Sequence, residues 1–184
     1  MQVHDLVALI SKAAYGPNSA EAVQEAMATL RDDLDGLAET LAYLPGVGGN
    51  AHQAFYRSPG LSLLKVNFPN GRRTPPHNHG TWATILLLKG GEKNTVYKRD
   101  ASGKMVRDRV VELRPGDIIH MPADCAHVAE CLGDEPAVGL HVYGANVLGV
   151  KRSMWDPETM EEMDLDWRQY EPLAQKASAM ASAP

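Results

Sequence analysis

Cysteine is scarce in this chain of 184 residues, which has only Cys125 and Cys131. Two cysteines cannot build a disulfide framework, and so low a content is typical of a reducing compartment. The sequence also has no run approaching the ~20 consecutive apolar residues that span a bilayer. Its first residues lack the basic segment that opens a secretory signal. We therefore expect a cytoplasmic protein with no membrane partner.

Positive charge is not in excess either, because 18 Lys and Arg stand against 23 Asp and Glu, a formal net charge of −5. Nucleic-acid binders usually concentrate positive charge on one face, so this balance argues against a nucleic-acid partner. Apolar residues make up 44% and charged residues 22%, as in ordinary globular proteins. A chain of this length fits one domain, and the composition leaves homo-oligomerisation open.

The apolar pattern divides the chain into a helical part and a β-rich part. Residues 1–45 carry apolar positions at helical spacing, whereas over residues 52–167 short β-rich runs alternate with Gly, Pro and Asn turns. About nine short strands at this spacing indicate a sandwich or barrel rather than βαβ units. We predict a single domain over residues 1–174, with helices packed on a β-barrel, and a flexible low-complexity tail at residues 175–184.

Three histidines form a candidate metal site. His77 and His79 lie two residues apart in RRTPPHNHGTW, and His127 follows later in GDIIHMPADCAHV. Side chains at i and i+2 of a strand point to the same face, so the first two imidazoles can reach one ion. Imidazole suits Fe, Zn, Cu and Ni, whereas Mg and Ca call for oxygen ligands. We predict a transition-metal site on these histidines.

The spacing around these histidines resembles the two motifs of the cupin superfamily. The residues that carry the resemblance are Gly71, His77, His79, Thr84 and Gly91 in the first motif, and Gly116, Pro122, Asp124 and His127 in the second. It implies a mainly β fold, the cupin double-stranded β-helix (a jelly-roll barrel), here preceded by N-terminal helices.

One position departs from the usual cupin pattern. Most cupins have a glutamate where this chain has Thr84, and the next acid, Glu92, lies out of position for the same ligand cluster. We therefore expect three neutral histidines and no carboxylate ligand. A divalent ion held in this way keeps its full charge and favours an anionic ligand such as a thiolate.

Three further segments resemble the cysteine dioxygenase family and its bacterial 3-mercaptopropionate branch: PPHNHGTWATILLLKGGE, EPAVGLHVYG and KRSMWDPETM. The resemblance runs over residues 52–167. It implies an Fe(II)-dependent enzyme that uses O₂ to convert a small thiol carboxylate, cysteine or 3-mercaptopropionate, to its sulfinate.

The same resemblance implies roles for residues around the metal. The family's Ser-x-His-x-Tyr segment corresponds to Gly139, His141 and Tyr143, which alternation places on one strand face. There His141 can hydrogen-bond Tyr143 and aim its hydroxyl at bound substrate or O₂. Glycine in place of the family serine shortens this chain of hydrogen bonds.

An arginine should bind the substrate carboxylate, because a guanidinium can form paired hydrogen bonds with it. Arg57 is the best match to the family's substrate-binding arginine. Arg72 and Arg73 lie nearer the metal motif but in a turn, where solvated charge is the simpler interpretation.

Two other classes of function stay open. One is a three-histidine cupin enzyme that uses zinc, nickel or manganese for isomerisation or C–C cleavage. The other is a non-catalytic cupin that binds a small ligand or a structural metal. The glycine at position 139 is the feature that most favours them.

Overall fold

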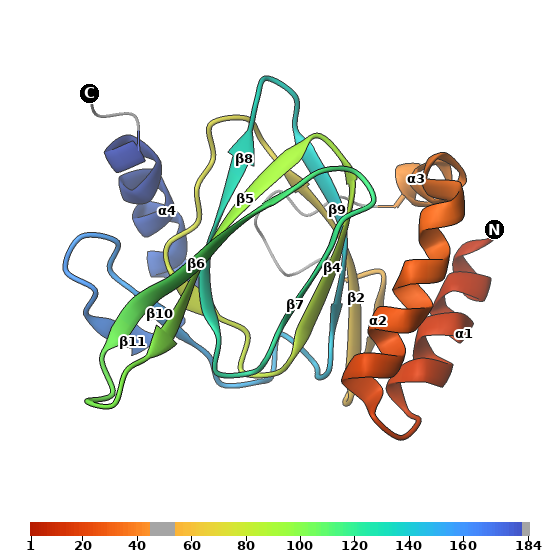
Figure 1. Cartoon of the computed structure of the whole chain (residues 1–184), viewed down its shortest axis with the longest axis horizontal. Coiled ribbons are helices and arrows are strands. Elements are labelled where there is room, and N and C mark those ends of the chain that lie inside the picture. Colours follow the sequence, from red (N-terminus) through yellow and green to blue (C-terminus); the bar gives the residue numbers. More distant parts are fainter. Residues whose placement is uncertain (45–53, 182–184) are drawn as a thin grey trace.

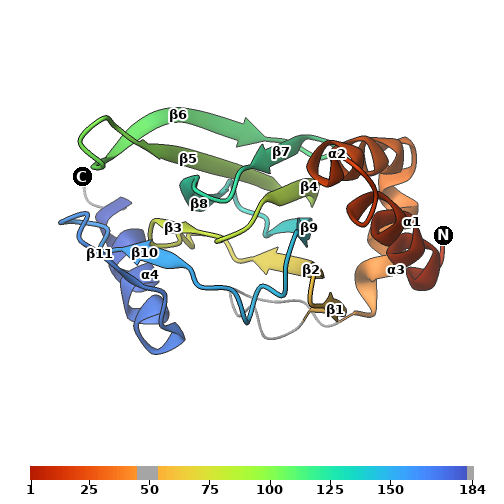
Figure 2. The ribbon, with the colours of Figure 1, turned by 90° about the horizontal axis from the view of Figure 1, so that it is seen from below.

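The computed structural model describes residues 1–44 and 54–181, so the predicted boundaries at residues 45 and 52 lie outside the described residues. The strands form two facing antiparallel sheets (Figure 2). The first sheet contains, in order, β1 (Tyr56–Ser58), β2 (Leu61–Phe68), β9 (Ala137–Tyr143), β4 (Ala83–Lys89) and β7 (Ile118–Met121). The second contains β11 (Glu162–Asp164), β10 (Ser153–Trp155), β3 (His77–Asn78), β8 (Ala126–Leu132), β5 (Gly91–Arg99) and β6 (Met105–Leu113).

Most neighbours in these sheets are far apart in sequence, because the chain repeatedly crosses from one sheet to the other. This is the connectivity of a jelly-roll barrel, the double-stranded β-helix. The predicted mainly β fold with N-terminal helices is confirmed.

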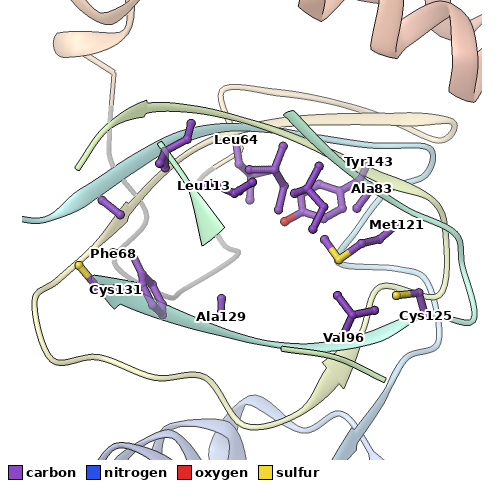
Figure 3. Close-up of a cluster of buried hydrophobic side chains, with 14 of the residues drawn as sticks. Leu64, Phe68, Ala83, Val96, Leu113, Met121, Cys125, Ala129, Cys131 and Tyr143 are labelled. Atoms are coloured by element: carbon purple, nitrogen blue, oxygen red, sulfur yellow. The ribbon is translucent and has the colours of Figure 1, made fainter. Parts of the chain in front are cut away.

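Alternate residues of each strand point into the barrel. Figure 3 shows Leu64, Ala83 and Tyr143 of the first sheet facing Val96 and Ala129 of the second. These side chains belong to one buried apolar cluster. The inward positions of the two sheets therefore also determine which residues can reach a site inside the barrel.

The N-terminal helices cover the outer face of the first sheet (Figure 1). They are α1 (Val3–Ala14), α2 (Ser19–Thr29), the short 3₁₀ helix η1 (Leu30–Asp33) and α3 (Leu34–Ala42). Their apolar stripes bury the outward residues of the sheet, including Leu61, Leu63 and Leu86. Strand β4 is thus buried on both faces along nearly its whole length, which explains its continuous apolar run ILLL without alternation.

The C-terminal helix α4 (Trp167–Ala181) packs on the opposite side of the barrel from the N-terminal helices (Figure 1). Helix α4 extends to residue 181, so residues 175–181 of the tail predicted to be flexible are helical, and residues 182–184 lie outside the described residues. Tyr170, Ala174 and Ala177 form a buried stripe at i, i+4 and i+7, and the two small alanines let the helix lie close to the barrel. Among the described residues, no helix is long and apolar enough to cross a membrane.

Candidate metal centre

The predicted histidines are brought together by the pairing of two short strands of the second sheet. His77 on β3 lies opposite His127 on β8, and His79 follows directly after β3. The imidazole ring centroids lie 4.6 Å apart for His77 and His127 and 4.9 Å apart for His79 and His127. All three side chains are buried.

The ring nitrogens of the three histidines converge, with one from each lying within 4.8 Å of the others. Nε2 of His127 lies 3.3 Å from Nε2 of His79. Two nitrogens that each lie about 2.0–2.1 Å from a shared ion, at an angle of about 90–109°, are separated by about 2.8–3.4 Å. The spacing therefore fits a metal ion, with His77 as the third ligand.

Hydrogen bonds on the opposite ring nitrogens orient two of the histidines. Nδ1 of His77 donates to the carbonyl oxygen of Pro75 at 3.0 Å, and Nδ1 of His127 donates to Oδ1 of Asn94 at 2.7 Å. Each bond leaves the Nε2 lone pair free for a metal. Nδ1 of His79 has no hydrogen-bond partner among the residues that the structure describes.

Asn94 is itself held by a buried carboxylate. Its Nδ2 donates to Oε1 of Glu92 at 2.8 Å, so its Oδ1 must face His127. The exposed fractions of Glu92, Asn94 and His127 are 3%, 0% and 3%. Glu92 is not among the three grouped ligands, as expected, but it lines the same cavity and reaches the third histidine through one amide. The sequence analysis missed this connection.

The three imidazoles are neutral in the folded protein. Burial lowers the pKa of His77 to about 4, and burial together with neighbouring histidines lowers the pKa values of His79 and His127 well below their ordinary range. A neutral imidazole is the form that binds a metal. The centre thus offers three ligands without the cost of removing a proton at neutral pH.

Thr84 faces away from this centre. The residue at the position of the usual cupin glutamate is therefore Ala83, one residue earlier than predicted. Its Oγ1 lies 2.8 Å from Nδ1 of His120 on the outer face of the sheet, below the N-terminal helices. The preceding residue, Ala83, points inward beside Tyr143. A gapped motif does not fix which of two adjacent residues points inward, because that depends on where the strand begins. An alanine at the inward position still supplies no carboxylate ligand.

The structure brings His141 and Tyr143 to the centre on the inner face of β9. Nδ1 of His141 lies 3.1 Å from the Tyr143 hydroxyl, and the Tyr143 ring centroid lies 5.1 Å from that of His79. Burial raises the pKa of Tyr143 and lowers that of His141 to about 3, so both are neutral.

Gly139 leaves this chain of hydrogen bonds open at its far end. Nε2 of His141 is buried and has no partner within the described part of the chain. A Cβ built on Gly139 would lie 3.0 Å from that nitrogen, which is where a serine side chain would enter.

The structure does not bring Arg57 to the centre. Arg57 lies on the edge strand β1 with an exposed side chain and does not line the cavity beside the histidines. Arg72 and Arg73 are not free solvated charges. Arg72 forms two hydrogen bonds to Glu171 of helix α4, at 2.9 and 2.8 Å, and Nε of Arg73 lies 3.9 Å from Oε2 of Glu130.

Arg152, which the sequence analysis missed, lines the cavity instead. It lies in the connection between β9 and β10, is 8% exposed, and forms no ion pair with a described residue. Gly80 allows this connection to pass close to His79, because it has a positive φ of 63° and a Cβ there would collide with the carbonyl oxygen of Lys151. The available signal was KRSMWDPETM, since the arginine stands at the start of a segment that resembles the family.

The cavity has a volume of about 80 Å³ and is lined by both polar and apolar side chains. The three histidines, Glu92, His141, Tyr143 and Arg152 are among its polar groups, and Val66, Phe68, Ala129 and Val147 are among its apolar ones. Trp167 and Tyr170 of helix α4 also line it. The only feature of the sequence that points to these two residues is the apolar stripe of the C-terminal segment. Such a stripe indicates a packed helix but does not indicate that the helix lines a pocket.

Fold and site together define a jelly-roll barrel with a buried three-histidine group suited to a metal ion. A family model for the cupin domain matches residues 64–143, so this part of the chain is similar to a cupin domain. The matched part runs from β2 to the end of β9 and is rather less than half of the chain. Arg152 and helix α4 lie beyond it.

Curated relatives include plant germin-like proteins. Germin-like protein subfamily 1 member 17 of Arabidopsis thaliana is 30% identical over 96 residues, covering 50% of this chain and 42% of the relative. Germin-like protein 9-3 of Oryza sativa subsp. japonica is 25% identical over 111 residues, covering 60% of this chain and 46% of the relative. The chain thus spans less than half the length of these relatives.

Similar solved structures show the same partial likeness. One is a hydroquinone 1,2-dioxygenase from Sphingomonas sp. TTNP3 with 4-hydroxybenzoate bound, at 14% identity and a TM-score of 0.43, covering 50% of this chain and 65% of that one. Another is a cupin family protein from Methanocaldococcus jannaschii with a double-stranded β-helix fold, at 12% identity and a TM-score of 0.42, covering 52% of this chain and 79% of that one. At these TM-scores neither bears on the activity of this chain.

Proposed function

We propose that this protein is an Fe(II)-dependent thiol dioxygenase that converts a short thiol carboxylate to its sulfinate. The observation that carries the proposal is the pairing of two features in one small cavity. Three neutral histidines lie on one side, and the buried cation Arg152, with no carboxylate partner among the described residues, also lines it. A ligand with a thiolate at one end and a carboxylate at the other matches both.

His77, His79 and His127 would hold the iron, since their convergent nitrogens and neutral state fit a divalent ion. When bound, Fe(II) supplies the redox chemistry that joins thiol and O₂. The reaction balances without a further reductant: a thiolate and one O₂ give one sulfinate, with both oxygen atoms forming new S–O bonds and the sulfur giving up the electrons. The protein therefore needs no second cosubstrate site.

Arg152 binds the substrate carboxylate in this proposal. A guanidinium presents two parallel N–H groups to a carboxylate, which fixes the direction of the ligand as well as its affinity. The cavity space of about 80 Å³ is on the scale of a few water molecules, which suits a three-carbon acid. Arg152 takes the role predicted for Arg57, which the structure leaves outside.

Tyr143 orients the reacting atoms through its hydroxyl. If Nδ1–H of His141 donates to the Tyr143 oxygen, the hydroxyl proton is free to donate into the cavity. The raised pKa of Tyr143 keeps that proton in place at neutral pH. His141 then acts as the residue that fixes the rotation of the tyrosine hydroxyl.

Oxygen uptake by the iron-loaded protein tests this function. The protein is loaded with Fe(II) without air and then exposed to O₂ with cysteine, 3-mercaptopropionate, mercaptosuccinate or cysteamine. We expect uptake with the thiol carboxylates, 3-mercaptopropionate and cysteine above all, and incorporation of both atoms of isotopically labelled O₂ into the sulfinate. Zinc-loaded protein is the matched control. Absence of thiol-dependent uptake by stoichiometrically loaded protein refutes the proposal.

A further inference from the structure

Arg152 is held by an aromatic ring rather than by a carboxylate. Its Cζ lies 5.2 Å from the centre of the Trp167 ring, over the ring face. None of the Asp or Glu side chains in the described residues pairs with it, although it is 8% exposed. A cation over an indole face is attracted to the ring without a formal counter-charge.

Whether Arg152 contacts a carboxylate or an aromatic ring determines which of its N–H groups can still bind a ligand. A salt bridge would occupy the N–H edge of the guanidinium, which is the edge that recognises a carboxylate. Stacking occupies only its flat face. Trp167 can therefore fix Arg152 in the cavity wall while leaving its hydrogen-bond donors for a ligand.

Trp167 comes from an element outside the matched cupin domain. It opens helix α4, and Tyr170, one turn later, also lines the cavity with its ring centroid 5.1 Å from that of Trp167. The Tyr170 ring in turn lies 5.7 Å from the ring of His77. A continuous row of rings thus connects the arginine to a candidate metal ligand.

Polar contacts hold the helix in this place. Glu171, next to Tyr170, forms the two hydrogen bonds to Arg72 on the loop before β3. Further along the helix, Lys176 forms ion pairs of 2.9 Å with Asp156 and with Glu158 in the turn between β10 and β11. The position of Trp167 is therefore set by contacts of its helix with two separate segments of the barrel, the loop before β3 and the turn between β10 and β11.

We propose that Trp167 is a positioning residue that holds the Arg152 guanidinium for carboxylate binding, so that helix α4 gives the cupin domain its selectivity for thiol carboxylates over plain thiols. The inference rests on the proposed role of Arg152 and deepens it. It makes the C-terminal helix part of the substrate site rather than a cover for the barrel.

Calorimetry on zinc-loaded protein under anaerobic conditions tests this without turnover. The two ligands are 3-mercaptopropionate and 2-mercaptoethanol, which differ in the carboxylate. In Trp167→Leu we expect the Kd for 3-mercaptopropionate to rise about 3- to 30-fold and that for 2-mercaptoethanol to stay unchanged. Trp167→Phe, which keeps a ring, should stay within about threefold of the wild type. If the ratio of the Kd for 3-mercaptopropionate to the Kd for 2-mercaptoethanol is the same in Trp167→Leu and in the wild type, the inference is overturned.

A double-mutant cycle shows whether Trp167 acts through the arginine. In an Arg152→Met background, Trp167→Leu should have no further effect on 3-mercaptopropionate binding. A loss as large as in the wild-type background would overturn the inference. Arg99→Ala is the matched control, because it removes a second cation–ring contact, with Trp155 at 5.8 Å, away from the cavity. It should leave both Kd values unchanged.

Two further measurements keep the test decisive. If Trp167→Leu does not fold, the NMR signal of the Arg152 Nε–H proton in the wild-type protein is measured instead. Stacking on the Trp167 ring shifts the chemical shift of this proton upfield, and an unshifted signal overturns the inference. Oxygen uptake separates the two proposals. Iron-loaded protein that consumes no O₂ with thiols refutes the dioxygenase, whereas the calorimetric comparison still decides whether Trp167 positions Arg152.

Discussion

The connection from Glu92 through Asn94 to His127 should control metal affinity. In Asn94→Leu, the Nδ1–H of His127 loses its acceptor at 2.7 Å and Glu92 loses its donor at 2.8 Å, both in a region closed to water. The imidazole can then change tautomer or rotate, so Nε2 no longer points at the ion. Loss of such an outer partner typically weakens metal binding about 10- to 100-fold.

Glu92→Gln separates orientation from charge. A glutamine can still accept from Nδ2 of Asn94, so His127 keeps its orientation, but the ionisable carboxyl group, whose pKa burial raises, is removed. We expect its metal affinity to fall by less than about tenfold, clearly less than in Asn94→Leu. Equal losses in the two variants would show that charge, not orientation, carries the effect.

The assay is a competition titration of Fe(II) or Zn(II) against a chelator of known affinity, with thermal unfolding measured in parallel. Thr84→Val is the control, because it removes the hydrogen bond to His120 from an equally buried position on the outer face of the barrel. It should bind metal as the wild type does. Wild-type affinity in Asn94→Leu would refute the reasoning, and weakened affinity in Thr84→Val would refute the assignment of Ala83 as the inward residue.

Three other predictions follow from the site. Arg152→Met should raise KM for a thiol carboxylate about 10- to 100-fold at unchanged iron content, since it removes charged hydrogen bonds; an unchanged KM contradicts the carboxylate site. Gly139→Ser should be more stable than Gly139→Ala by about 1–2 kcal/mol in thermal unfolding, because only serine can donate to the unpaired Nε2 of His141; equal stabilities contradict this. Because the pKa of His77 falls from 6.5 to about 4 on folding, the unfolded chain takes up the proton first as the pH drops. Urea unfolding of the metal-free protein should therefore show stability lost from about pH 6.5 down to pH 4, on the order of 3 kcal/mol from this group, and no loss in that interval contradicts its burial as a neutral imidazole.

The sequence predicted the parts of the site that lie on regular strands. His141 and Tyr143 alternate on β9, so their shared inner face and their contact follow from the period of two. The convergence of His77 and His127 required long-range pairing of β3 with β8, which spacing alone does not determine but the cupin resemblance implied. Thr84 shows the limit, because a one-residue uncertainty in where β4 begins exchanges the inner and outer faces of the barrel.

Arg152 could not be found by counting along strands, because it approaches the centre from a connection and not from a strand of the sheets. Its place depends on a close passage at Gly80, and its orientation depends on a ring from α4. Neither contact follows from a sequence period. Arg57, by contrast, lies on a strand that the sequence indicates, which is why the sequence predicted Arg57 as the carboxylate-binding arginine. Burying a guanidinium also carries a desolvation cost, which a carboxylate, an aromatic face or a bound ligand can offset, whereas a solvent-exposed arginine carries no such cost. In the proposed function, the residues that select the substrate therefore lie where the barrel meets its C-terminal helix, while the residues that would bind the metal lie within the barrel itself.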